Sequence, residues 1–246
     1  MHLHGQRSST NSNQITVGVI IPAFNEEQSI RRVLDDIPRE FSNDAYEVAI
    51  RQIVVVDNGS TDATASVAEK AGAKVLYEPR SGYGQACFTG LQTLFKCDIV
   101  VFLDGDYSDY PEEMQDLIIP ICKDGVDLVI GSRTRGKNQP GALLPQAIIG
   151  NFVSTWIIRL LFGVKYTDLG PFRAVSWEAL KRIDMQDRDF GWTVEMQVKA
   201  AKLQMRTLEV PVSYRKRIGR SKISGTLAGS VRAGFKILLT IYRHAR

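Results

Sequence analysis

The first 130 residues of the chain alternate short apolar runs with segments of helical periodicity. The apolar runs, which we expect to be strands, lie at residues 17–21, 53–56, 74–77, 99–103 and 127–130. Apolar residues recur at helical spacing in residues 26–37, 61–71, 84–95 and 111–121. Strands that alternate with helices, and that are apolar throughout, are typical of a parallel sheet covered on both faces. The sequence therefore predicts an α/β fold.

Polar residues follow these predicted strands at the points where the strands end. The clusters lie at residues 22–26, 57–62, 104–109 and 131–133. In open α/β sheets, ligands bind outside the carboxyl ends of the strands. We therefore predict that the active site lies at this edge of the sheet.

The second half of the chain has a different pattern. Residues 143–164 are apolar with few charges, residues 168–173 form a predicted turn, and residues 192–203 form a predicted helix. Residues 208–214 resemble an edge strand because they contain Pro211. A basic segment at residues 215–222 follows, and residues 226–246 have the periodicity of a helix. The five cations of the basic segment are Arg215, Lys216, Arg217, Arg220 and Lys222.

Composition excludes several classes of protein. The 31 Lys and Arg against 27 Asp and Glu give a net charge of +4, too weakly basic to indicate a nucleic-acid partner. Three cysteines without a CxxC pattern argue against a disulfide scaffold or zinc ribbon and fit a reducing compartment. Residues 138–158 are uncharged, but Pro140, Gly141 and Pro145 interrupt them, so we predict no membrane-spanning helix. Neither GxGxxG nor a Walker loop occurs, which argues against NAD enzymes and NTPases.

Asp104 and Asp106 are the strongest chemical signal, because they directly follow the apolar run at residues 99–103. Two carboxylates one residue apart, on a turn that leaves a strand, can reach the same divalent cation. Oxygen ligands select Mg²⁺ or Mn²⁺. Ser108 lies close enough to contribute a weak ligand. The alternative is an ordinary turn, since Asp and Gly suit turns, but the other acidic turns at the same edge favour the metal site.

Other polar residues at this edge have two interpretations each. Asp57 either accepts from a nucleobase or ribose, or makes an Asx turn before the next helix. Phe24 can stack on a base, while Glu26 accepts from ribose or caps a helix. Arg133 follows the fifth strand, where an arginine fork would bind phosphate. The basic segment suits a polyanionic ligand or an acidic membrane surface, although any one of its side chains alone suits a solvated loop.

Taken in order, these motifs resemble glycosyltransferase family 2, the inverting enzymes with a GT-A fold. The matching stretches are IIPAFNEE, VVVDNGSTDAT, RSGYGQA, FLDGDYSDYPEE, IGSR, TDLGPFR and EVPVSYRKRIGRSK. Within the family, the chain is most similar to dolichol-phosphate and polyprenyl-phosphate mannosyl- and glucosyltransferases. The resemblance implies a GT-A domain at residues 16–222, with a nucleotide-sugar half at 16–135 and an acceptor half at 136–222. A flexible arm at residues 1–15 would precede it, and an amphipathic helix at residues 223–246 would follow.

The resemblance also implies a reaction. A metal-dependent inverting transfer would move a hexose from GDP-mannose or UDP-glucose to a polyprenyl or dolichyl phosphate. Asp104 and Asp106 match the Mg²⁺ or Mn²⁺ ligands, and Ser108 stands where relatives have Gln or His. Asp168 matches an acidic position near the acceptor and is a candidate base. Glu195 matches an acidic position to which we assign no role.

The remaining roles implied by the resemblance concern the nucleotide sugar. Arg133 and Arg217 match arginines that contact phosphates and are also assigned to catalysis, while Asn58 departs from the family's second Asp. The residues assigned to the nucleotide sugar are Pro22, Ala23, Phe24, Glu26, Asp57, Arg80, Gly105, Arg133, Arg217 and Lys222.

We expect residues 143–164 and the C-terminal helix to rest on a bilayer, because the helix mixes apolar residues with Arg232, Lys236, Arg243 and Arg246. This would make the protein peripheral to the cytoplasmic face of the membrane; the alternative is that both segments form core or a dimer interface. Two other functions stay open: transfer to a sugar or lipid hydroxyl, which needs a base such as Asp168, and nucleotide-sugar binding without turnover. The sugar, the base of the donor, the acceptor, the choice between Mg²⁺ and Mn²⁺ and the oligomeric state also stay open.

Overall fold

The computed structural model describes residues 13–42, 46–219 and 227–245 of the chain. The strands are β1 (Asn13–Ala23), β2 (Glu40–Ser42), β3 (Tyr46–Asp57), β4 (Lys74–Tyr77), β5 (Ile99–Phe102), β6 (Leu128–Ser132), β7 (Arg173–Ser176) and β8 (Thr207–Pro211). The helices are α1 (Ile30–Asp36), α2 (Thr64–Lys70), α3 (Tyr83–Thr93), the short 3₁₀ helix η1 (Pro111–Glu113), α4 (Met114–Asp124), α5 (Pro145–Phe162), α6 (Trp177–Ile183), α7 (Trp192–Lys202) and α8 (Leu227–Ala245).

The strands form one sheet in the order β2-β3-β1-β5-β7-β6-β8, with β4 paired to β3. The neighbours β4, β3, β1 and β5 run parallel, as the first half of the sequence predicts. The second half makes the sheet mixed, because β7 is antiparallel to both β5 and β6. β8 pairs with β6 at the end of this order, so its place as an edge strand agrees with Pro211.

Three elements were not expected from the sequence: β2, β7 and α6. The predicted turn at residues 168–173 ends where β7 begins, at Arg173, and this arginine is completely buried. With a charged residue at its start, this four-residue strand contains only two apolar residues, too few for the apolar run by which strands are recognised. β1 begins at Asn13, so the last residues of the predicted N-terminal arm pair with β3.

Buried apolar side chains form two clusters, one on each face of the sheet. Val19 and Ile21 of β1 belong to the cluster that also contains side chains of α1, α2 and α4. Ile20, between them, belongs to the cluster with α3, α6 and α7. Successive strand residues point to opposite faces, so a sheet covered on both faces needs strands that are apolar throughout.

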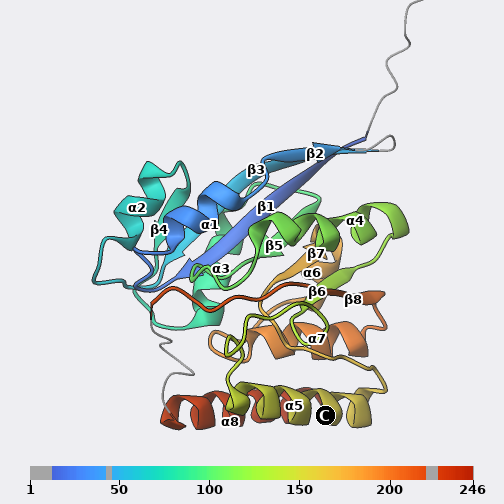
Figure 1. Ribbon diagram of the computed structural model, residues 1–246. Coiled ribbons are helices and arrows are strands. Elements are labelled where there is room, and N and C mark those ends of the chain that lie inside the picture. Colours follow the sequence, from blue (N-terminus) through green and yellow to red (C-terminus); the bar gives the residue numbers. More distant parts are fainter. Residues whose placement is uncertain (1–12, 43–45, 220–226, 246) are drawn as a thin grey trace, which may run out of the picture.

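Helices α5 and α8 form an outer layer. They lie side by side beyond α7, on the side of α7 away from the sheet (Figure 1). The apolar residues predicted at 143–164 form α5, and the predicted C-terminal helix is confirmed as α8. No helix in the described part of the chain combines the length and apolarity needed to span a membrane.

Candidate active site

A cavity of about 240 Å³ opens where β1 and β5 end, and we call it the strand-end cavity. It brings together eight residues that the sequence assigned to the site: Pro22, Ala23, Phe24, Glu26, Asp104, Gly105, Asp106 and Arg217. Its other lining residues are Asn58, Ser81, Gly82, Tyr83, Asp189 and Phe190. The charged side chains predicted to act in the site thus lie at the carboxyl ends of the strands, where α/β folds bind their ligands.

The carboxylates of Asp104 and Asp106 are suited to a divalent cation. Oδ1 of Asp104 is buried and has no hydrogen-bond partner among the described residues. Burial, together with the charge of Asp106, raises the pKa of Asp104 to about 7. The described residues contain no group of three or more His, Cys, Asp or Glu side chains that could hold a metal ion. A cation here would therefore complete its coordination with water and substrate phosphate, as Mg²⁺ commonly does.

Ser108 orients Asp106 and does not line the cavity. Its backbone N–H and its hydroxyl donate to Oδ1 of Asp106, at 2.9 and 2.5 Å. This short-range turn holds the Asp106 carboxylate, whose other oxygen lies 3.2 Å from Nη1 of Arg217. Both carboxylate oxygens of Asp109 are buried, and neither has a hydrogen-bond partner in the part of the chain that the structure describes. Burial and the nearby charges of Asp104 and Asp106 raise its pKa well above the ordinary value.

The basic segment crosses over the loop that carries these acids. The backbone N–H of Arg215 donates to Ser108 O at 2.9 Å, and that of Ile218 donates to Asp106 O at 3.0 Å. The Arg215 guanidinium stacks 3.3 Å from the centre of the Tyr107 ring, so this cation is structural. Arg217 enters the cavity and also donates to Glu26 at 2.9 Å. The Arg220 and Lys222 assignments lie outside the described residues.

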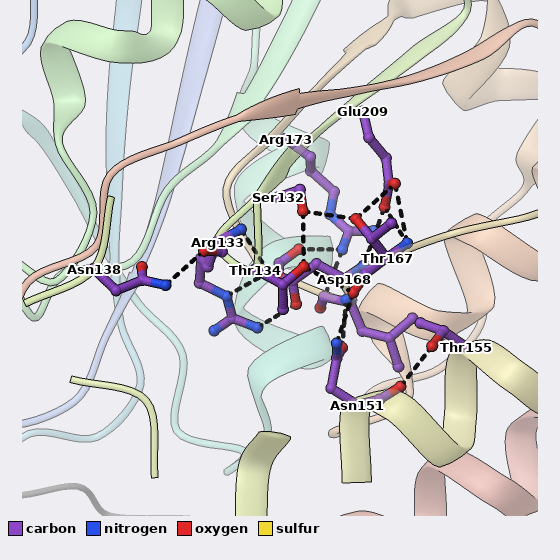
Figure 2. Close-up of polar contacts among 12 residues, drawn as sticks. Ser132, Arg133, Thr134, Asn138, Asn151, Thr155, Thr167, Asp168, Arg173 and Glu209 are labelled. Atoms are coloured by element: carbon purple, nitrogen blue, oxygen red, sulfur yellow. Dashed lines mark hydrogen bonds and ion pairs between the residues drawn. The ribbon is translucent and has the colours of Figure 1, made fainter. Parts of the chain in front are cut away.

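Arg133 and Asp168 form an ion pair that three hydrogen bonds hold together (Figure 2). The backbone N–H and Nε of Arg133 donate to Asp168 Oδ2 at 2.8 Å, and Nη2 donates to Oδ1 at 2.7 Å. Asp168 is only 1% exposed. Burial alone would raise the pKa of Asp168, but the charge and hydrogen bonds of Arg133 outweigh it and hold the pKa below its ordinary value. A carboxylate bound in this way is a weak proton acceptor and is suited to holding Arg133 in place.

The loop around Asp168 is fixed from several elements (Figure 2). The Leu169 N–H donates to Asn151 Oδ1 of α5 at 2.8 Å, and Thr167 N–H donates to Glu209 of β8 at 2.8 Å. Arg173, whose pKa burial lowers to about 10, donates to Thr193 O at 2.8 Å and to Gly170 O. The sequence assigned no role to Arg173, because its burial depends on a contact with Thr193, 20 residues away on α7.

Three described residues assigned to the nucleotide sugar lie outside the lining of the strand-end cavity: Asp57, Arg80 and Arg133, of which Arg133 lines a different cavity, described below. Oδ1 of Asp57 accepts from Ser60 N–H at 3.0 Å, which is the Asx turn considered as the alternative. Arg80 pairs with Glu78 at 3.0 Å and its side chain is 74% exposed. The neighbouring Asn58 lines the cavity in their place, and its Oδ1 accepts from Gly82 N–H at 2.9 Å.

A second cavity of about 200 Å³ lies between α5 and α8, and we call it the helix-pair cavity. Most of its lining residues are small or apolar, and among the residues that the structure describes Arg133 is the one that carries a charge. The lining consists of Arg133, Gln146, Ala147, Gly150, Asn151, Leu169, Thr193, Ala233, Gly234 and Ile237. A cation at an apolar cavity is suited to an amphiphilic anion.

Comparison with known proteins supports the family assignment. The family model for glycosyl transferase family 2 matches residues 18–183. An uncharacterised glycosyltransferase of Mycobacterium tuberculosis is 37% identical over 218 residues, which cover 87% of this chain and 93% of the relative. A dolichyl-phosphate hexose transferase of Haloferax volcanii is 30% identical over 215 residues, covering 87% of this chain and 89% of that protein.

A solved structure supports the fold. Glucosyl-3-phosphoglycerate synthase from Mycobacterium tuberculosis, in complex with Mn²⁺, UDP and glucosyl-3-phosphoglycerate, superposes with a TM-score of 0.70 at 22% identity. The match covers 94% of this chain and 80% of the synthase. The predicted GT-A fold is confirmed, and the chain is a glycosyltransferase that belongs to family 2.

Proposed function

We propose that this glycosyltransferase moves a hexose from a nucleoside-diphosphate sugar to a polyprenyl phosphate. The helix-pair cavity carries the proposal, because it joins apolar walls to the guanidinium of Arg133. A lipid phosphate has the same two parts, an apolar chain and an anionic head. The dolichyl-phosphate hexose transferase among the relatives supports this acceptor class.

The strand-end cavity is the proposed donor site. Phe24, which is exposed at its edge, can stack on a nucleobase. A Mg²⁺ or Mn²⁺ ion held by Asp104 and Asp106 would supply Lewis-acid stabilisation of the leaving diphosphate. Glu26 and Asp106 hold the guanidinium of Arg217 in place, so its N–H groups are oriented beforehand to donate to the diphosphate oxygens. The Mn²⁺ and UDP of the structurally similar synthase support this assignment.

The acceptor chemistry follows from the state of Asp168. A lipid phosphate is already an anion at neutral pH, so the protein must orient it and needs no strong base. Arg133, held by Asp168 and stacked 5.1 Å from the centre of the Tyr214 ring, provides that orientation. A hydroxyl acceptor would require a base, and Asp168 is occupied by its ion pair. Attack from the face opposite the diphosphate would invert the anomeric centre.

The outer layer is the proposed membrane contact. Ile149, Phe152, Trp156 and Leu160 are exposed at intervals of three or four residues along α5. On the adjacent α8, Phe235, Leu238 and Tyr242 are exposed, and the exposed cation Arg243 follows Tyr242. Lys236 instead pairs with Asp187 at 3.2 Å. Contiguous exposed apolar residues mark an interaction surface, and nearby cations favour an anionic bilayer. A bilayer at α5 and α8 would place a polyprenyl chain at the helix-pair cavity.

The test is transfer of labelled sugar into lipid. We would incubate the protein with labelled UDP-glucose or GDP-mannose, Mn²⁺, and vesicles that contain undecaprenyl or dolichyl phosphate. We expect label in the organic phase, and a large loss of it for Arg133→Met. Arg135→Met is the matched control, because Arg135 is exposed, lies outside both cavity linings, and its side chain donates to Glu209 O at 2.8 Å. Label transferred only to hydroxyl acceptors, or to none, would contradict the proposal.

A further inference from the structure

The loop between α6 and α7 brings a third aspartate to the strand-end cavity. Asp189 and Phe190 both line this cavity, although no sequence motif assigned them a role. Asp189 is partly exposed, and its carboxylate makes no hydrogen bond or ion pair within the described part of the chain. Mg²⁺ usually takes only one or two carboxylates together with water and substrate phosphate, so with Asp104 and Asp106 in that role Asp189 is available for another ligand.

The position of this loop relates the two cavities. Thr193, four residues after Asp189, lines the helix-pair cavity. Residues 189–193 therefore form part of the wall of both cavities. In the proposed reaction the transferred sugar must lie where the donor site meets the acceptor site, so it must lie close to this segment.

The loop is held firmly from both sides. The Gln85 N–H donates to Arg188 O at 2.8 Å, and Gly84 N–H donates to Asp189 O at 3.2 Å. On the other side, the buried carboxylate of Glu195 accepts from the backbone N–H of Asp187 at 2.7 Å. These contacts account for Glu195, whose role the sequence left open, as a residue that positions the loop.

Two glycines make the close approach possible. A Cβ on Gly82 would lie 2.2 Å from Arg188 O, and one on Gly84 would lie 2.3 Å from Asp187 O. Both distances are too short for a side chain, so only glycine fits at either position. The loop that carries Asp189 thus packs directly against the glycine-rich segment at residues 80–84, which is not a phosphate loop.

The chemistry of Asp189 suits a sugar. An ionised carboxylate accepts hydrogen bonds from more than one hydroxyl group, and the ring of Phe190 beside it offers an apolar surface to the C–H face of a hexose. We infer that Asp189 binds the hydroxyl groups of the transferred hexose and so contributes to the choice of donor sugar. This inference rests on the proposed donor site.

The test compares nucleotide sugars with nucleotides that lack the sugar. Calorimetric titrations with Mn²⁺ would measure the Kd of UDP-glucose, UDP, GDP-mannose and GDP for the wild type and for Asp189→Ala. Hydrogen bonds to a charged group are strong enough that we expect the Kd of the bound nucleotide sugar to rise about tenfold or more. The Kd of the matching nucleoside diphosphate should stay unchanged. Asp184→Asn is the control, because Asp184 lies in the same loop, outside the cavity lining, and Asn tolerates its positive φ of 50°.

Three results would overturn the inference. An unchanged Kd for the nucleotide sugar in Asp189→Ala would exclude contact with the hexose, even if turnover were lost. An equal loss of affinity for the diphosphate, with or without a lower melting temperature, would assign Asp189 to the structure of the whole site. A wild type that binds nucleoside diphosphates but no nucleotide sugar would overturn the proposed donor, and with it this inference.

Discussion

Replacing Asp168 with Asn separates the two roles that its position allows. The change keeps the size of the side chain and removes the charge that pairs with Arg133. If Asp168 holds Arg133, the variant should be less stable and should bind the lipid phosphate less well. If Asp168 is a general base, the variant should instead retain its stability and acceptor binding and lose turnover.

The expected loss of stability follows from burial. Breaking a buried ion pair by removing one partner costs about 3–5 kcal/mol. The Arg133 side chain remains 18% exposed, and the Asn oxygen still accepts a hydrogen bond, so we expect about 2–3 kcal/mol. For a chain of this size, that lowers the melting temperature by about 4–12 °C.

The pH dependence has a definite sign. The pKa of Asp168 in the folded protein lies below its ordinary value of 3.8, because Arg133 outweighs the effect of burial. The charge therefore stabilises the fold fully above about pH 4, and this contribution is lost as the pH falls through the folded pKa. The difference in melting temperature between wild type and Asp168→Asn should be constant from pH 7 to pH 5 and should shrink below pH 4.

The assay is a set of thermal melts combined with steady-state kinetics on lipid phosphate. We expect a raised KM for the acceptor and an acid limb of the pH–rate profile that does not move. Asp116→Asn, an exposed acid on α4, is the control for the loss of one charge. A variant with the wild-type melting temperature and KM, but with turnover reduced by about 10²–10⁴ as loss of a general base predicts, would refute the positioning role.

Three further predictions concern other parts of the site. Gly84→Ala should lower both the melting temperature and nucleotide-sugar affinity, because its Cβ would lie 2.3 Å from Asp187 O; an unchanged melt would show that the loop can shift. Trp156→Glu should weaken sedimentation with anionic vesicles about tenfold or more, since burial of a large apolar side chain contributes about 1.5–3 kcal/mol, while the exposed site keeps the melt unchanged. Removal of divalent cations should abolish transfer, and Mn²⁺ affinity should fall as the pH drops below 7, because burial raises the pKa of Asp104 to about 7 and its proton competes with the ion.

The fold was predictable where one local signal was enough. The apolar runs gave the strands of the first half, because a strand buried on both faces leaves a continuous pattern. β7 was missed because Arg173 is buried by hydrogen bonds to Thr193 O and Gly170 O. Gly170 is a near neighbour in the sequence, but the contact with Thr193 is set by tertiary packing, and neither the charge of Arg173 nor its neighbours in the sequence indicate it.

The site was predictable only in part, again where a local sequence signal marked the residue. Asp104 and Asp106 follow a strand, so their place at the sheet edge could be inferred. Arg215 and Arg217 are the same residue type two positions apart, yet only Arg217 lines the cavity. The difference depends on the backbone bonds that tie the segment to Ser108 and Asp106. Asp189 could not be found from sequence, because its loop reaches the cavity through contacts with a distant glycine-rich segment.

Arg133 and Arg217 are both held by ion pairs, and this limits the positive charge that they can offer to the reaction. Each is held by a buried carboxylate, Arg217 by Glu26 and Arg133 by Asp168. Each pair is then close to neutral, so the arginines fix geometry more than they supply net positive charge. Two phosphate groups that approach each other repel, by about 4 kcal/mol for unit charges 4 Å apart at an effective dielectric constant of 20. Offsetting that repulsion requires net positive charge, which these pairs do not provide, and this makes a divalent cation at Asp104 and Asp106 the expected source.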